Sequence, residues 1–170
     1  MDTRHTFTAF CGHQRIAAGQ VAEMLSAVKA WVELHGEAGI LYFDDETGTQ
    51  VDFNLRQTIA PRPGRPRLGV VSREITLLPR HWKWLESQPS GASAALRRLV
   101  DQARNSPGDR ARQAKEAAGR FLTAIAGNLP HYEEVTRALW RGEQERMANL
   151  MKEWPSDIRD HALRIAACEI

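Results

Sequence analysis

The chain has 170 residues, of which 42% are hydrophobic and 26% charged, with a formal charge of +2 at pH 7. This composition fits a soluble protein with one modest core or two small ones. Cys11 and Cys168 are too few for a disulfide framework and lack the spacing of metal ligands. No apolar run approaches the length of a membrane span, and the amino terminus lacks the apolar core of a signal peptide. We therefore expect a cytoplasmic protein without cofactor or membrane contact.

The charges are distributed unevenly along the chain. From Pro61 to Arg80 there are five arginines against Glu74 alone, whereas from Gln20 to Asn54 seven acidic residues stand against Lys29. Such asymmetry predicts a basic binding centre beside an acidic module that stays away from polyanions.

The first predicted module covers residues 1–57 and has the order ββαββ. Alternation and turn residues predict two strands, a helix stopped by Gly36, and a second hairpin. The expected elements are Thr6–Phe10, Gln14–Ala18, Gln20–His35, Ile40–Phe43 and Gln50–Phe53. The acidic turn Asp44–Gly48 lacks the length and spaced oxygen ligands of a calcium loop, so we expect a solvated turn.

Residues 58–69 form a basic arm rich in proline, glycine and arginine. Arg62, Arg65 and Arg67 surround a Gly64-Arg65-Pro66 core that is similar to an AT-hook, in which such a turn lies in a narrow minor groove. The prolines hold an extended backbone and the arginines supply charge. A stiff, soluble hinge is the alternative.

The central segment, residues 70–105, predicts one strand followed by two short helices. Val70–Leu77 is rich in β-branched residues, and Pro79 suits the first turn of a helix reaching about Gln88. Ser93 is placed to cap a second helix from Ala94 to about Arg104, with Leu96, Leu99, Val100 and Ala103 at helical spacing. We expect Trp82 and Trp84 to lie in a core.

This order resembles the ribbon-helix-helix DNA-binding fold, in which two chains pair their strands into an antiparallel ribbon that enters the major groove. The resemblance depends on the run Arg73–Leu77, on Trp82 and Leu85, and on the leucine stripe after Gly91-Ala92-Ser93. It implies a homodimer, because one strand and two short helices cannot bury their apolar surface alone. An ordinary strand and two helices within an α+β protein are the alternative.

Residues 106–170 predict a small helical bundle. Apolar stripes indicate helices over Asp109–Ala126, Pro130–Arg141, Glu143–Trp154 and Asp157–Ala167, the last capped by Ser156. His131 with Glu134, and Asp157 with His161, have spacings that could hold a metal, but neither pair has a third ligand nearby. We expect both to be surface pairs, and nothing in the sequence indicates an enzyme.

The full chain also resembles a bacterial family of uncharacterised proteins. Among the residues that carry this resemblance are Thr8-Ala9-Phe10, Phe43-Asp44-Asp45, Leu77–Trp82, Ala95–Val100 and Trp154-Pro155. The resemblance implies a bacterial source and a shared architecture, and brings no established activity.

The sequence therefore predicts an α+β protein that binds DNA as a dimeric transcription regulator. The candidate DNA-binding residues are Arg62, Arg65, Arg67, Arg73, Glu74, Thr76, Arg80, Ser93 and Arg97. An antitoxin-like or adaptor protein that holds a partner through its C-terminal helices is the alternative. A hydrolase or metal site using His131, Glu134, Asp157 or His161 is a third hypothesis.

Overall fold

The computed structural model describes residues 5–36, 39–53 and 71–167. The chain divides into two compact units, one made of Met1–Ala60 with Ala111–Ile170 and the other of Pro61–Arg110. Four strands and seven helices are present in the described residues, which confirms the predicted α+β class.

The first unit contains a four-stranded antiparallel sheet in the order β2-β1-β3-β4. The elements of this part are β1 (Phe7–Cys11), β2 (Gln14–Gly19), α1 (Val21–His35), β3 (Ile40–Asp44) and β4 (Gln50–Val51). The predicted ββαββ order is confirmed, with β4 shorter than expected. A bulge follows Ala9, where the pairing of β1 with β2 shifts register.

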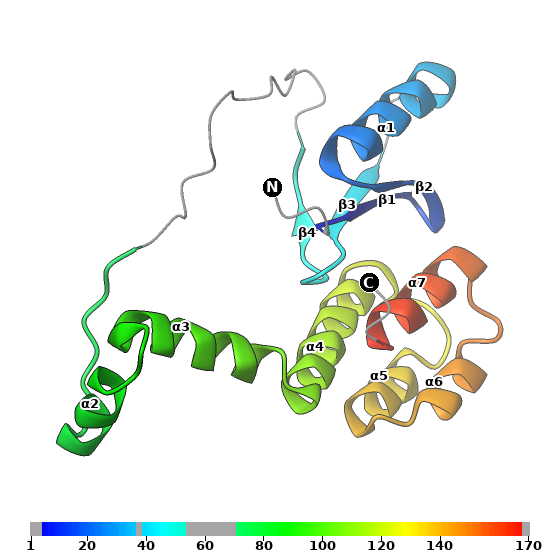
Figure 1. Ribbon diagram of the computed structural model, residues 1–170. Coiled ribbons are helices and arrows are strands. Elements are labelled where there is room, and N and C mark those ends of the chain that lie inside the picture. Colours follow the sequence, from blue (N-terminus) through cyan, green and yellow to red (C-terminus); the bar gives the residue numbers. More distant parts are fainter. Residues whose placement is uncertain (1–4, 37–38, 54–70, 168–170) are drawn as a thin grey trace. The chain divides into compact units, whose positions relative to one another are not determined.

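Alternating side chains divide the sheet between two cores. Ala9 and Tyr42, which pair across β1 and β3, pack with Met24 and Val28 of α1. The next residues along these strands, Phe10 and Phe43, belong to a separate core with the helices from α4 onward. Because neighbouring residues of a strand point to opposite faces, one sheet serves both cores. Figure 1 shows α1 on one side of the sheet and α4 and α7 on the other.

The C-terminal helices form the larger core. They are α4 (Pro107–Ile125), α5 (Tyr132–Arg141), α6 (Gln144–Leu150) and α7 (Ser156–Ala166). Buried alanines at 114, 117 and 118 allow close packing on α4 before Phe121 and Leu122 fill the centre. The predicted bundle thus shares its core with the N-terminal sheet.

Gly48, in the turn before β4, fixes the contact between the sheet and α4. Its φ of +66° lies in the left-handed region, and a Cβ at this position would overlap the Ala117 carbonyl. Only glycine satisfies both conditions. Arg120 of α4 also donates to the Thr47 carbonyl at 2.7 Å, so the turn is held to the helix by two adjacent contacts.

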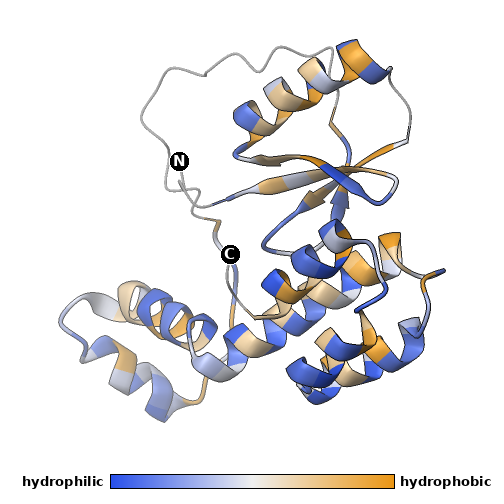
Figure 2. Ribbon diagram, turned by 90° about the vertical axis from the view of Figure 1, so that its right-hand side faces the viewer, coloured by the Kyte–Doolittle hydropathy of each residue, from blue (hydrophilic) through white to orange (hydrophobic). Residues whose placement is uncertain are grey.

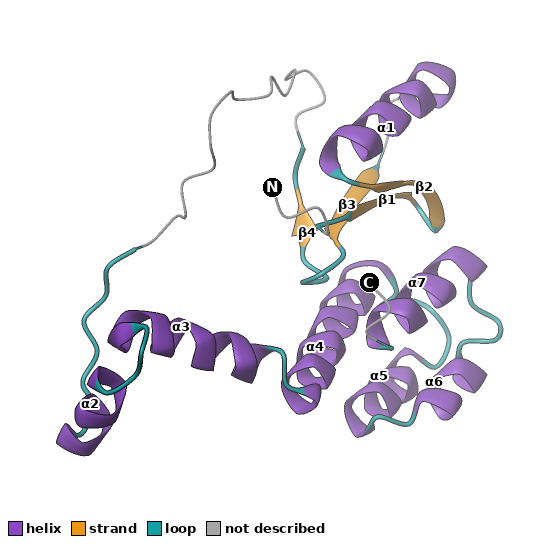
Figure 3. Ribbon diagram, viewed as in Figure 1, coloured by secondary structure: helices purple, strands orange, loops and turns teal. Residues whose placement is uncertain are grey.

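The second unit contains α2 (Pro79–Glu86) and α3 (Gly91–Arg104). Both helices agree with the prediction. The strand predicted over Val70–Leu77 does not form in its described part, residues 71–77, and Val70 lies outside the described residues. A strand needs a neighbour that supplies a hydrogen-bonding ladder, and the described residues provide none here. Figure 3 draws this segment as a loop that leads into α2.

Candidate nucleic-acid interface and a buried polar cluster

The α2–α3 hairpin is held by local contacts. Pro79 occupies the start of α2, and at its other end the side chains of Ser87 and Gln88 donate to the Trp84 carbonyl at 2.7 and 3.2 Å. Gly91 opens α3 with a φ of +73°. These contacts satisfy carbonyls that a helix end leaves unpaired, so the hairpin is shaped mainly by local chemistry.

Six of the predicted DNA-binding residues are described, and all are exposed: Arg73, Glu74, Thr76, Arg80, Ser93 and Arg97. The arm residues Arg62, Arg65 and Arg67 lie outside the described residues. The predicted role of Ser93 as a cap is wrong, because α3 begins two residues earlier at Gly91 and the cap position falls on Ser90. Ser93 is therefore the third residue of the helix, where its carbonyl accepts from Arg97 Nε at 3.2 Å.

The cations of this hairpin differ from those of the first unit in their partners. Between residues 71 and 105 there are six exposed cations, against three acidic residues, and none joins an ion pair within the described chain; they are Arg73, Arg80, Lys83, Arg97, Arg98 and Arg104. In the first unit most cations are paired, and Arg112, Arg137 and Arg146 each contact a glutamate within 3.0 Å, whereas Arg15, Lys29, Lys115 and Lys152 have no carboxylate partner among the described residues. The hairpin therefore offers uncompensated positive charge to solvent.

Apolar side chains are exposed on the same unit. Only Leu85 and Ala95 are buried within α2 and α3. The expectation that both tryptophans are core residues is wrong for Trp84, which is 49% exposed, while Trp82 is half-buried. Figure 2 shows hydrophobic positions in orange interrupting the hydrophilic surface of both helices.

A second candidate site is a buried polar cluster in the first unit. Asp45, directly after β3, is 1% exposed and accepts hydrogen bonds from the hydroxyls of Thr6 at 2.7 Å and Thr8 at 2.8 Å. Two groups from α7 approach the same carboxylate: His161 Nε2 lies 3.6 Å and Arg164 Nη2 3.7 Å from Asp45 Oδ1. The cluster thus connects the sheet with the last helix.

The hydrogen bonds define the protonation of His161. Arg164 can only donate, so at 2.9 Å from its Nη2 the His161 Nδ1 must accept, which places the ring proton of the neutral form on Nε2. Burial lowers the pKa of His161 to about 4; Asp45 opposes this shift, and the cations of Arg164 and Arg15 add to it. The imidazole is therefore neutral at pH 7, and its Nε2–H has no hydrogen-bond partner within the described structure.

These positions correct two expectations. Asp45 is not part of a solvated turn, and Asp157 and His161 do not form a surface pair. Instead, the Asp157 carboxylate accepts from the Arg15 backbone N–H at 2.9 Å, and His161 points into the core beside Phe10 and Phe121, with ring centroids 5.3 and 4.6 Å away. The spacing of Asp157 and His161 in the sequence relates only residues of one helix. The carboxylate that His161 approaches belongs to Asp45, which follows β3 and is distant in the sequence.

The chemistry of this cluster is structural. Asp45 and His161 are each 1% exposed, so a solute cannot reach them without unfolding of the region. A metal at Nε2 would require the proton to move to Nδ1, where it would oppose the Arg164 donor. No group of three or more histidine, cysteine or acidic side chains that could hold a metal occurs within the described ranges.

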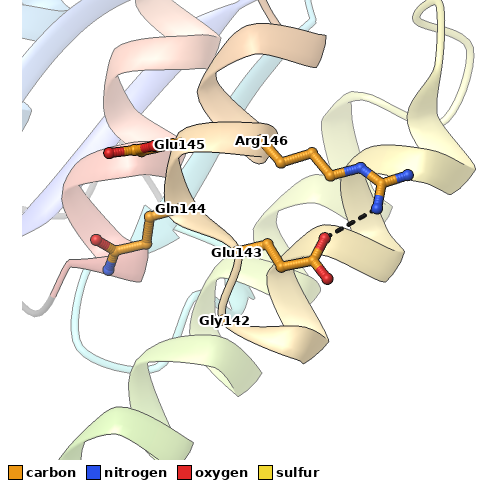
Figure 4. A pocket seen from close by; sticks show the side chains of 5 residues that line it. All are labelled: Gly142, Glu143, Gln144, Glu145 and Arg146. Carbon is orange, nitrogen blue, oxygen red and sulfur yellow. Dashed lines mark hydrogen bonds and ion pairs between the residues drawn. The ribbon is translucent and has the colours of Figure 1, made fainter.

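Two shallow hollows lie on the first unit. One, of about 540 Å³, is lined by residues 142–146 at the start of α6, where Glu143 is ion-paired with Arg146 (Figure 4). The other, of about 510 Å³, lies between β4, α4 and α5 beside Trp140, which is 50% exposed. Neither is lined by a buried titratable group.

The described residues form an α+β protein whose first unit has a sheet between two cores; in the sequence, the residues of the basic helical hairpin lie between the two stretches that make up this unit. Family comparison gives a more particular identity. Residues 6–61 and 57–166 match the DUF2239 family, described as an uncharacterized protein conserved in bacteria, and the chain belongs to this family. No curated protein and no solved structure matches it. In the described residues no helix is both long and apolar enough to cross a membrane.

Proposed function

We propose that this protein binds duplex DNA as a dimer and acts as a transcription regulator. The binding surface consists of the segment 71–80, the exposed face of α3 and the arginine-rich arm. Paired segments from two chains enter the major groove, while Arg62, Arg65 and Arg67 follow the minor groove or the adjacent phosphates.

The observation that supports this proposal is the set of six exposed cations in the hairpin that have no carboxylate partner. A cation that is already paired has to give up its carboxylate before it can bind a phosphate, whereas these side chains are available at once. Duplex DNA is a polyanion of high charge density, and neutralising its phosphates releases bound counterions. The hairpin therefore offers a higher share of unpaired cations to a polyanion than the first unit, where most arginines are ion-paired.

The individual residues have different roles in this proposal. Arg73, Arg80 and Arg97 contact phosphates and set the position of the protein on the duplex. Thr76 contacts a base edge or a thymine methyl group, and Glu74 accepts from a cytosine amine. Ser93, in the first turn of α3, offers its hydroxyl and a backbone N–H near the positive end of the helix.

The test is titration of the full chain into labelled duplex DNA at two salt concentrations. We expect affinity that falls steeply with salt. Arg73→Ala or Arg97→Ala removes one phosphate contact per subunit, hence two per dimer, so the slope of log K against log salt should flatten by about 1.8. Arg137→Ala is the matched control, because Arg137 is exposed on α5 and paired with Glu133.

Two outcomes would reject the proposal. One is the absence of DNA affinity at low salt. The other is an equal loss for Arg137→Ala and for the hairpin variants, because the charge of the whole chain, and not the hairpin, would then determine binding.

An adaptor that binds another protein is the second candidate function. It is favoured by Trp140, whose exposed ring borders the hollow between β4, α4 and α5, since exposed tryptophans are enriched in protein interfaces. This function predicts a stable complex in the absence of nucleic acid, lost in Trp140→Ala and retained in Arg73→Ala.

A further inference from the structure

Strand β4 is an outer strand of the sheet, and its outer side has no strand neighbour within the described residues (Figure 1). The opposite edge, β2, is partly covered, because the N–H of Arg15 donates to the Asp157 carboxylate of α7 at 2.9 Å. No comparable contact covers Gln50 of β4 in the part of the chain that the structure describes. The backbone of an uncovered outer strand can pair with a further strand.

The hairpin determines which backbone groups of β4 face outward. The Asp44 N–H donates to the Thr49 carbonyl at 3.0 Å, so these two residues are bonded across the hairpin. Bonded and non-bonded pairs alternate along an antiparallel ladder, and the next pair is Phe43 with Gln50. The N–H and carbonyl of Gln50 therefore point away from β3, towards the open edge.

The side chains of this edge divide between the two faces of the sheet. Val51 and Phe53 pack on the smaller core with α1. Gln50 is opposite Phe43, which lies in the larger core with α4. Because side chains alternate along an extended chain, Gln50 and Asp52 belong to the α4 face, and both are exposed.

The hollow beside Trp140 lies on this same face, and Gln50 lines it together with residues of α4 and α5. Most of its polar side chains already have partners. The hydroxyls of Thr123 and Thr136 each donate to a helix carbonyl at 2.9 Å, and Glu116 pairs with Arg120 at 3.4 Å. What the hollow offers is the half-exposed Trp140 ring and the threonine methyl groups, which suit an apolar side chain.

We infer that β4 and this hollow bind an extended segment of another protein, which joins the sheet as a further antiparallel strand. The segment has an apolar or aromatic side chain opposite Gln50. Two residues earlier it has a lysine or arginine, opposite Asp52. The inference specifies the partner of the adaptor function, on which it rests, and does not depend on DNA binding.

Cross-strand pairing supplies the specificity. Directly opposed residues share a face of the sheet, so the side chain opposite Gln50 points to the α4 face, where the Trp140 hollow lies. Asp52 forms no ion pair within the described chain, and a cation opposite it would complete a pair of opposite charges. The acidic stretch from Gln20 to Asn54, with seven acidic residues against Lys29, also favours a basic segment.

Titration of labelled peptides into the full chain tests the side-chain pattern, with fluorescence anisotropy as the readout. The first probe is the acetylated and amidated hexapeptide Ser-Lys-Thr-Phe-Thr-Ser. Alanine in place of its phenylalanine should weaken binding by about tenfold or more, because the hollow then stays empty. In Ser-Thr-Phe-Thr-Lys-Ser the lysine lies away from Asp52, so binding should be about threefold weaker.

N-methylation of the first peptide tests the backbone bonds without changing the protein. A methyl group on the phenylalanine nitrogen removes the N–H that donates to the Gln50 carbonyl, so binding should be about tenfold weaker. The matched control is N-methylation of the preceding threonine. Its N–H points away from β4, so binding should be retained.

Variants of the chain, shown by circular dichroism to be folded, test the same contacts from the other side. Gln50→Pro removes the outward N–H, a position at which an edge strand tolerates proline, and should weaken binding by about tenfold. Gln50→Ala keeps this N–H and should bind within about threefold of the native chain. Trp140→Ala and Asp52→Lys should weaken binding, whereas Arg73→Ala should not.

Several outcomes would overturn the inference. These are equal affinities for the phenylalanine and alanine peptides, equal losses for the two N-methylated peptides, and no binding of any peptide at millimolar concentration. A dimer of the 19.1 kDa chain that the peptide dissociates in sedimentation equilibrium would assign this edge to a second copy and also overturn it.

The inference and the proposed functions can fail separately. Peptide binding that Trp140→Ala abolishes, but that Gln50→Pro and N-methylation leave unchanged, overturns strand pairing and retains the adaptor function. A chain that binds the peptide as predicted but has no DNA affinity supports the inference and rejects only the transcription regulator.

Discussion

At the scale of single residues, His161 shows how one buried side chain couples stability to pH. Its ring is enclosed by Phe10 and Phe121, and Arg164 occupies Nδ1. Protonation would place a second positive charge beside Arg164 in the core. The nearby Asp45 carboxylate compensates in part, but burial dominates, and the folded protein therefore resists protonation at this site.

We expect the free energy of unfolding to fall as pH decreases from about 6.5 to about 4. In this window the unfolded chain, with an ordinary histidine pKa of 6.5, binds a proton that the folded protein, with a pKa of about 4, does not. The difference of 2.5 units corresponds to about 3 kcal/mol, present in full above pH 6.5 and lost as pH falls.

Urea unfolding at pH 7, 5 and 4 measures this effect. The carboxylates also titrate in acid, so the relevant quantity is the difference between the native chain and His161→Gln, which keeps a polar side chain without the titration. The pH dependence should be weaker by about 3 kcal/mol in this variant. Parallel curves for the two proteins would contradict the assignment of a depressed pKa to His161.

At the scale of elements, the turn before β4 positions the sheet on α4. Gly48→Ala should destabilise the fold by about 3 kcal/mol, because the new methyl group would both strain a left-handed residue and collide with the Ala117 carbonyl. Gly12→Ala is the matched control: Gly12 also has a positive φ, of +54°, but open space around it, so about 1 kcal/mol is expected.

Thermal or urea unfolding of the two variants distinguishes strain from collision. Equal losses for Gly12→Ala and Gly48→Ala would mean that backbone strain alone matters and that the turn is free to move away from α4. A larger loss for Gly48→Ala, with Arg120→Ala also destabilising, would support the close contact.

Elements with local determinants could be predicted from the sequence, and contacts between distant segments could not. Pro79 and Gly36 mark helix ends through their own backbone preferences, so α2 and α1 were found to within two residues. The Asp45–His161 contact joins residues 116 positions apart, and the local pattern around each one indicates only a turn and an ordinary helix. The segment predicted as a strand over Val70–Leu77 has strand-like composition, but residues 71–77 form no strand, because a strand also requires a partner that composition does not supply.

At the scale of the whole molecule, the two units should differ in stability. The first unit has two continuous cores, whereas α2 and α3 each bury a single residue. Little apolar packing therefore resists the local unfolding of these two helices. In a free monomer, the amides of α2 and α3 should therefore exchange with solvent much faster than those of α4, α5 and α7.

Hydrogen exchange at several protein concentrations tests this difference. If a second copy covers the hairpin, protection of α2 and α3 should rise with protein concentration, while protection of α4 and α7 should not change. Exchange in α2 and α3 that is slow and independent of concentration would show that the hairpin is stabilised within its own chain.

The order of the chain also constrains how the protein is made. Phe10 and Phe43 lie in one core with Val135, Met151 and Ile165, so this core cannot close until α7 has left the ribosome. The smaller core around Met24 and Val28 needs only the first 53 residues. We therefore expect the sheet with α1 to form first, leaving Phe10 and Phe43 exposed as an apolar face that a nascent-chain chaperone would recognise until α4 to α7 arrive.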